Sequence, residues 1–290
     1  MSMFANRKAV IATMHKKEKV IAPLLEKDLG LQIVVPTNFN SDKYGTFTTE
    51  IERAGDQLQA ARKKAENAME LTGVTIGIAS EGSFGPHPYF PGIAINRELL
   101  LFIDKEEDIE IIGYVANTET NFSQKEVSSF EEAYEFAKSV GFPKHGLIAK
   151  KNAQSTNTKE IFKGIVSVEE LKTAFEELTA RKISIFSKKH SHVWMETDMR
   201  AMYNPMRMKN IELATLDLVN KIHSQCPKCS FPGYEVVERL NGLKCKACGF
   251  PTDLIRCHVY RCKKCNHQEK EMFPNGEEYA DPSKCYICNP

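Results

Sequence analysis

All nine cysteines of this 290-residue chain lie between Cys226 and Cys288, and no cysteine precedes Cys226. Disulfides of an oxidising compartment would be spread through the fold, so this clustering indicates metal ligands. A Cys-x-x-Cys turn directs two thiolates at one ion, and two such turns complete a tetrahedral zinc site. Eight of the nine cysteines form four pairs with this spacing: Cys226/Cys229, Cys245/Cys248, Cys262/Cys265 and Cys285/Cys288. We therefore expect two structural zinc ions in a C-terminal double zinc-ribbon module, residues 224–290.

The spacing between the pairs bears on which cysteines share an ion. Fifteen residues separate the first two pairs and nineteen separate the last two, and both gaps suit a short hairpin. The expected arrangement is therefore sequential, with one zinc on the first four cysteines and one on the last four. Spacing alone leaves an interleaved arrangement open. Cys257 is left over, and we expect it to be a small strand residue beside His258.

The charge of this module bears on its partners. Residues 224–290 contain ten Lys/Arg and eight Asp/Glu, and eight thiolates with two Zn²⁺ bring the net charge to about −2. A module of that charge gains little from neutralising phosphates, the main source of non-specific nucleic-acid affinity. Folding support or contact with a protein partner is therefore favoured, and nucleic acid stays open as an alternative.

Residues 1–223 have the pattern of an α/β domain, and we expect it to carry the catalytic or binding site. Apolar runs predict strands at 8–14, 31–36 and 74–80, alternating with helices at 18–30 and 57–73. An antiparallel pair, two serine-capped helices with strands between them, and a last helix at 205–223 follow. This order predicts a mixed sheet flanked by helices.

Polar segments follow the first three strands, and in such sheets ligands bind beyond the carboxyl ends of the strands. The segment "SEGSFGPHP" after the third strand is therefore expected to be an active-site loop. Lys17 and Lys19 stand where a strand meets a helix N-terminus, a suitable place to hold phosphate. Glu52 and Glu81 offer the oxygen ligands that Mg²⁺ requires.

Two further groups are candidates for substrate contacts. Ser83 and His87 lie in the expected loop, although "GSFG" lacks the G-x-S-x-G spacing of a nucleophile elbow, and a rigid turn is an equally good interpretation of His87. The segment 190–208 concentrates unlike polar side chains. Its arginines, Arg200 and Arg207, suit phosphate or carboxylate clamps, the alternative being a loop held by salt bridges.

The segments "ATMHKKEKVIAP", "FTTEIERAGD", "ASEGSFGPHP", "ETDMRAMYNPMRM" and the terminal "CNP" resemble, along nearly the whole chain, a bacterial family known as domain of unknown function 6671. That family brings no established activity.

The N-terminal segment, residues 1–80, also resembles the inosine/xanthosine triphosphate pyrophosphatases. That family has a strand ending in Thr-x-Asn-x-x-Lys and a helix with Ala-x-x-(Lys/Arg)-Ala-x-x-Ala, and "VIATMHKKEKVIAPLL" and "AARKKAENA" follow this plan. The resemblance implies that Thr13, Lys17 or Lys19, and Lys64 contact substrate. It also implies that Glu52 and Glu81 bind Mg²⁺ and activate water to release pyrophosphate. His15 replaces the motif's Asn, and Glu18 stands where its Lys would be.

The leading hypothesis is a Mg²⁺-dependent phosphohydrolase that acts on a nucleotide. The alternative is a non-catalytic, zinc-stapled protein that binds a nucleotide, RNA or a protein partner. The start of the sequence lacks the apolar core of a signal peptide, and no apolar run is long enough to cross a membrane. We therefore expect a cytoplasmic protein that does not associate with membranes.

Overall fold

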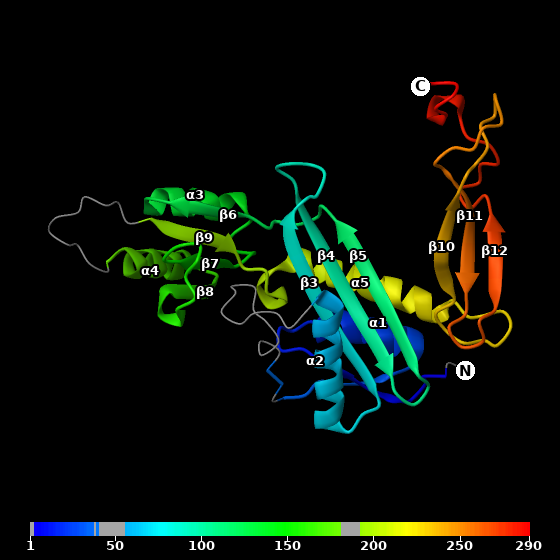
Figure 1. Ribbon diagram of the computed structural model, residues 1–290. Helices are drawn as coiled ribbons and strands as arrows, with labels where there is room; N and C mark the ends of the chain where they lie inside the picture. The colour runs from blue at the N-terminus through cyan, green and yellow to red at the C-terminus, as the bar shows by residue number, and fades with distance from the viewer. Residues whose placement is uncertain (1–2, 38, 41–55, 181–191) are drawn as a thin grey trace. The chain divides into compact units, whose positions relative to one another are not determined.

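The computed structural model describes residues 3–37, 39–40, 56–180 and 192–290. It divides into two compact units, Met1–Val219 and Asn220–Pro290. The first unit contains two sheets and the second contains one (Figure 1).

The first sheet of unit 1 has the strand order β2-β1-β3-β4-β5. β1 pairs in parallel with β2 and β3, whereas β4 pairs antiparallel with β3 and β5, so the sheet is mixed as predicted. Its elements are β1 (Lys8–Ile11), α1 (Glu18–Leu29), β2 (Gln32–Val34), α2 (Gln57–Thr72), β3 (Ile76–Pro86), β4 (Ala94–Asp104) and β5 (Ile109–Asn117).

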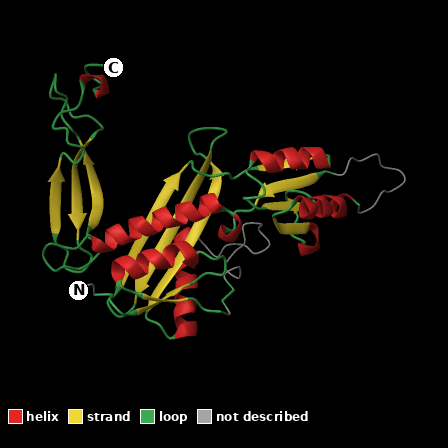
Figure 2. Ribbon diagram, turned by 180° about the vertical axis from the view of Figure 1, so that it is seen from behind, coloured by secondary structure: helices red, strands yellow, loops and turns green. Residues whose placement is uncertain are grey.

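Helices cover both faces of this sheet (Figures 1 and 2). α2 packs on one face through alanines, and a core forms there with Val10, Leu99 and Leu101. α1 and α5 (Pro205–His223) cover the other face. Gly113 of β5 permits the approach of α5, because a Cβ there would lie 2.1 Å from the Ala214 carbonyl oxygen.

The helix boundaries follow from capping. α1 and α2 end at Gly30 and Gly73, which adopt left-handed φ values of 70° and 68° that suit glycine. Asp56 starts α2 with a capping box, in which its side chain accepts from the backbone N–H of Gln59. The predicted helices at 18–30 and 57–73 are thereby confirmed.

The second sheet of unit 1 is antiparallel, with the order β6-β9-β7-β8. The two predicted serine caps are confirmed: Ser129 and Ser167 accept from backbone N–H groups in the first turns of its helices. Strands at β7 and β8 were expected, but not that they form a separate sheet with β6 and β9, which are only four and five residues long. Its elements are β6 (Gln124–Val127), α3 (Phe130–Ser139), β7 (Leu147–Lys150), η2 (Thr158–Glu160), β8 (Ile161–Ile165), α4 (Val168–Thr179) and β9 (Val193–Thr197), and η3 (Ala201–Tyr203) leads into α5.

Unit 2 is built on the antiparallel sheet β10-β11-β12. The strands are β10 (Glu235–Asn241), β11 (Ile255–Arg261) and β12 (Gln268–Met272), and a single turn, η4 (Pro282–Lys284), precedes the last cysteine pair.

One local prediction was wrong. Residues 80–86 of the segment "SEGSFGPHP" are not a loop, because β3 runs on to Pro86 and pairs with β4 along its whole length. Gly82 and Gly85 lie inside this strand. The length of β4 explains this result. Because β4 is a largely apolar strand of 11 residues, it pairs with β3 over the same length, and this pairing outweighs the preference of the β3 glycines for turns.

Candidate active site and metal centres

The edge of β3 that faces β1 becomes available where β1 ends. The pairing stops at Ile11 with Ile78, while β3 continues. The chain leaves β1 through Thr13, whose Oγ1 accepts from the backbone N–H of His15. Lys17 then stands at the N-cap position of α1 without a side-chain capping hydrogen bond, and its buried Nζ donates to both the carbonyl and the hydroxyl of Ser80, each at 2.9 Å.

On the α2 face of the sheet, Lys64 forms an ion pair with Glu81. The side chains of Lys64 and Glu81 are only 9% and 6% exposed. Gln57, in the first turn of α2, donates through Nε2 to the Glu81 carbonyl at 2.6 Å, which fixes the strand against the helix start. The pair is therefore held by two elements and is largely removed from water.

On the α5 face, Arg207 binds Glu98, with Nε 2.6 Å from Oε1. Both side chains are at most 1% exposed. The guanidinium also donates to the Met199 carbonyl and stacks 5.3 Å over the ring of Phe84. Gly82 makes room for this pair, because a Cβ there would lie 2.4 Å from the Glu98 carboxylate.

These groups set the charge state of Lys17. Burial, and next the neighbouring Arg207, lower the pKa of Lys17 to about 7, while Glu81 and Glu98 act in the opposite direction. The cluster of Lys17, Lys64, Arg207, Glu81 and Glu98, hereafter the Lys17 cluster, has three cations and two carboxylates. It carries a net charge of +1 when Lys17 is protonated. A buried positive charge of this kind favours an anionic ligand.

Two residues of β4 accompany the cluster. Asn96 and Glu98 are fully buried, and within the described residues neither polar atom of the Asn96 amide nor Oε2 of Glu98 has a hydrogen-bond partner. Each such group costs about 1–3 kcal/mol when it stays unpaired. Because Asn96 and Glu98 are two residues apart on one strand, their unpaired polar atoms lie on the same face of the sheet, the α5 face.

The structure brings together four of the predicted site residues: Lys17, Lys64 and Glu81 directly, and Arg207 through its effect on Lys17. Thr13 is buried on the turn that leads to Lys17. Glu52 lies outside the described residues.

The remaining predicted residues occupy other surroundings. Lys19 is exposed in the first turn of α1, and Ser83 is half-buried in β3 opposite Arg97. His87 accepts the backbone N–H groups of Tyr89 and Phe90, as a turn residue does. Arg200 binds the buried Asp198 carboxylate, with Nη2 2.6 Å from Oδ2, and stacks on Tyr203. Arg200 thus forms an intramolecular salt bridge, which was the alternative to a phosphate or carboxylate clamp for the segment 190–208.

Sequence reasoning missed Ser80, Asn96 and Glu98. A signal for the last two exists in "AINRELLLFID", where an amide and an acid alternate on a strand that is otherwise largely apolar. Such residues on a buried strand face are rarely left without a role.

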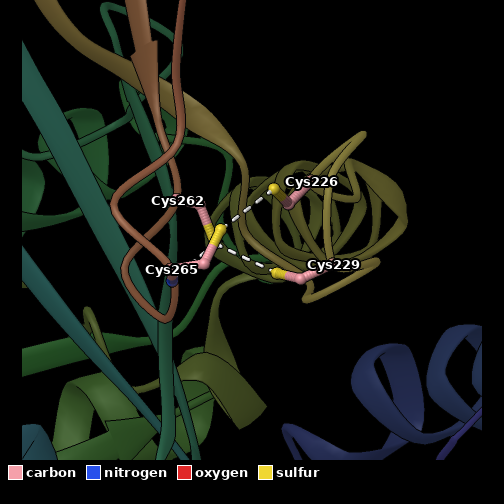
Figure 3. A group of neighbouring side chains, drawn as sticks. All are labelled: Cys226, Cys229, Cys262 and Cys265. Carbon is pink, nitrogen blue, oxygen red and sulfur yellow. Dashed lines mark hydrogen bonds between the residues drawn. The ribbon is translucent and has the colours of Figure 1, made fainter.

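The cysteines of unit 2 form two separate groups of four. Cys226, Cys229, Cys262 and Cys265 make one group, and Cys245, Cys248, Cys285 and Cys288 make the other; within each group all sulfur atoms lie within 4.8 Å (Figure 3 shows the first). Tetrahedral zinc with Zn–S bonds of about 2.3 Å requires sulfur atoms roughly 3.8 Å apart. Four cross-pair Sγ···Sγ distances are 3.6–3.8 Å, so the donor sets fit zinc.

The local backbone makes each cysteine pair a metal-binding turn. In the first three pairs the residue after the second cysteine has a positive φ: Ser230 58°, Gly249 72° and Asn266 56°. Its N–H donates to the carbonyl of the first cysteine at 2.8–3.0 Å. The backbone N–H of Cys248 lowers the pKa of Cys245 to about 7, which favours the thiolate that a metal needs.

The expectation of sequential zinc binding was wrong, and the groups are interleaved. The first pair precedes β10 and the second follows it. A seven-residue strand spans about 23 Å, too far for both pairs to reach one ion. The antiparallel return along β11 brings the third pair back to the first. Cys257 lies buried in β11, next to His258, as expected.

The fold and sites thus define an α/β protein with a buried, net-positive charge cluster and a module for two structural metal ions. Residues 64–290 match the model of a family described as Domain of unknown function (DUF6671), and the chain belongs to this family. A search of curated proteins finds no match. Among the described residues, no helix has the length and apolar character needed to cross a membrane.

Proposed function

We propose that this protein is a phosphohydrolase that acts on a nucleotide, with the Lys17 cluster as the phosphate site. The observation that carries the proposal is the buried excess of positive charge around Lys17. A phosphate group neutralises this excess and supplies acceptors for charge-assisted hydrogen bonds. The resemblance of residues 1–80 to nucleoside triphosphate pyrophosphatases agrees with this assignment.

Lys17 is the residue that would contact the phosphate first. A protonated lysine has three N–H donors, and Ser80 accepts two of them. The third has no partner in the described part of the chain, so it is available to an acceptor atom of a ligand. Lys64 and Arg207 are each paired with a carboxylate that offsets their charge, so the net positive charge of the cluster comes from Lys17.

Mg²⁺ fits this site only together with its substrate. Among the described residues, the only groups of three or more metal-binding side chains are the two cysteine sets. Mg²⁺ commonly needs just one or two protein carboxylates when substrate phosphates supply the other oxygens. Glu81 is one such carboxylate, with Glu52 as the proposed second. A bound Mg²⁺ would polarise the phosphate and lower the pKa of a water molecule.

The protein's own groups would then divide the work. Lys17 and Lys64 hold and orient the phosphates, and Glu81 positions the attacking water and accepts its proton. Lys64 has to release Glu81 in part, since the two now form an ion pair. The phosphate is the anion that would draw Lys64 away.

This ion pairing also favours the second candidate, a binding protein without catalysis. Glu81 and Glu98 each face a cation, so neither carboxylate is free to act as a base before a ligand arrives. In that case the cluster would hold a nucleotide, and the zinc module would support the fold or contact an RNA or protein partner.

Phosphate and pyrophosphate release distinguishes the two candidates. Standard and deaminated nucleoside triphosphates would be incubated with Mg²⁺ and wild type, Glu81→Gln or Glu70→Gln. Glu70 is an exposed acid on the same helix as Lys64 and serves as the matched control. A hydrolase releases product with wild type and Glu70→Gln and loses at least about 100-fold of its rate in Glu81→Gln. Binding without release by any triphosphate contradicts hydrolysis and favours the binding protein.

A further inference from the structure

A groove of about 290 Å³ lies along the first half of α5, apart from the residues of the Lys17 cluster. Three segments meet there: the chain after β5, the turn before β7, and α5 itself. This volume is near the lower end of the range of ligand pockets, about 300–1,000 Å³. The groove therefore suits a small molecule or one end of a larger one.

One buried polar side chain in its lining lacks a partner. His145 is 9% exposed, and within the described residues its Nδ1 makes no hydrogen bond. Its backbone N–H donates to the Gly141 carbonyl at 3.1 Å, which fixes the residue in the turn. Burial lowers the pKa of His145 and so favours the neutral ring, although a side-chain hydrogen bond with Asn204 acts in the opposite direction. A neutral imidazole offers one donor and one acceptor.

The other polar group in the wall is already occupied. Asn210 donates through Nδ2 to the Glu119 carbonyl, and its Oδ1 accepts from Asn117, both at 2.8 Å. Asn210 therefore shapes the groove and has little left to offer a ligand. Nδ1 of His145 is a buried polar atom at the wall that has no hydrogen-bond partner among the described residues.

The charges around the groove favour an anion. Lys144 and Lys209 line it, against a single acid, Glu119. The groove also runs beside the N-terminus of the 19-residue helix α5, where the helix dipole adds partial positive charge. Lys209 is exposed, so its ammonium can turn toward a ligand at small cost.

The same groove has an apolar wall. Met206 and the partly exposed Leu213, about two helical turns apart on the same face of α5, line it. An inorganic ion would leave this wall unused, whereas an anion attached to an apolar body would cover it.

We infer that this groove is a second ligand site, for a small organic anion whose charged end meets Lys209 and Lys144 and accepts from or donates to His145. A carboxylate and a phosphate ester share this chemistry. The site is independent of the proposed phosphohydrolase function, because it uses none of the residues assigned to that reaction.

The test is calorimetric titration of the full-length protein with phenyl phosphate, benzoate, inorganic phosphate and acetate. Either phenyl phosphate should bind more tightly than inorganic phosphate, or benzoate more tightly than acetate. Which of the two aromatic anions binds identifies the charged group that the site prefers. Lys209→Gln should weaken this binding by about tenfold or more, the usual worth of a charge-assisted hydrogen bond. Lys27→Gln removes an exposed lysine from the last turn of α1 and should change nothing.

Two readouts separate this site from the Lys17 cluster and from a purely structural effect. Binding should persist in Lys17→Met. The imidazole nitrogen signals of His145, assigned by their loss in His145→Gln, should shift when the anion is added. The inference is overturned if neither aromatic anion binds at millimolar concentration. It is equally overturned if Lys209→Gln binds like wild type, or if Lys17→Met abolishes the binding.

Discussion

Replacing Lys17 by methionine should make the ligand-free protein more stable near neutral pH. Lys17 loses its charge readily because it is buried, and burial lowers its pKa from 10.5 to about 7. At pH 7 the unfolded chain holds this proton fully and the folded protein holds it about half the time. Folding at pH 7 then costs about 4 kcal/mol through this one group, at roughly 1.4 kcal/mol per pKa unit.

The sign of the pH dependence follows from the same pKa values. Because the unfolded state binds more protons between pH 7 and 10.5, stability rises with pH across that window. Relative to Lys17→Met, wild type should therefore gain about 2 kcal/mol between pH 7 and pH 9. At pH 7 the gain on substitution is smaller than about 4 kcal/mol, because methionine leaves the Ser80 carbonyl without its donor.

Urea denaturation at pH 7, 8 and 9 measures both effects. The fluorescence of Trp194, the only tryptophan, reports on unit 1. Titrations elsewhere in the chain cancel when wild type is compared with Lys17→Met at each pH. Parallel stability profiles for the two proteins would instead mean that Lys17 keeps an ordinary pKa in the folded state.

Other substitutions test the packing and the metal centres. Gly82→Ala should destabilise unit 1 by about 1–3 kcal/mol in the same urea assay, because its Cβ overlaps the buried ion pair on the α5 face. Gly85→Ala, in the same strand with nothing within 4 Å, should differ little from wild type. Zinc released to a colorimetric chelator should fall from two ions to one in Cys229→Ser and stay at one when Cys262→Ser is added. Adding Cys245→Ser to Cys229→Ser should instead release no zinc, and the opposite pattern would show sequential binding.

Much of the fold was predictable from local signals. The glycine ends of α1 and α2, the serine caps of the helices in the second half of unit 1, and the antiparallel pair β4–β5 all matched. Helix α5 begins and ends at the residues expected, 205 and 223. These features depend on neighbouring residues, which sequence patterns record directly.

Features that depend on distant residues were harder to predict. β3 is longer than expected because β4 pairs with it, and no local pattern in "SEGSFGPHP" reports its partner. The zinc ligands were correctly identified, but their grouping depends on the direction in which β11 returns along β10. The spacing between cysteines shows which residues are metal ligands, but it does not show which strands pair and therefore which cysteines share an ion.

The candidate site shows the same division. Lys17, Lys64 and Glu81 were found through residue patterns on consecutive elements, whereas Glu98 and Asn96 enter from β4, beyond those patterns. Ser83 shares the α2 face of β3 with Glu81, because residues two apart on a strand point to the same side, but it lies further along the strand, half-buried opposite Arg97.

Calorimetric titration of Mg²⁺-imidodiphosphate, a slowly hydrolysed pyrophosphate analogue, measures whether the net-positive Lys17 cluster holds a phosphate-bearing ligand. The titration would compare wild type and Lys17→Met at pH 7 and pH 9. Wild type should bind the ligand at pH 7 and more weakly at pH 9, as Lys17 loses its proton, and Lys17→Met should show no measurable binding. Equal affinity in the two proteins, or no binding by wild type at millimolar ligand, would contradict it.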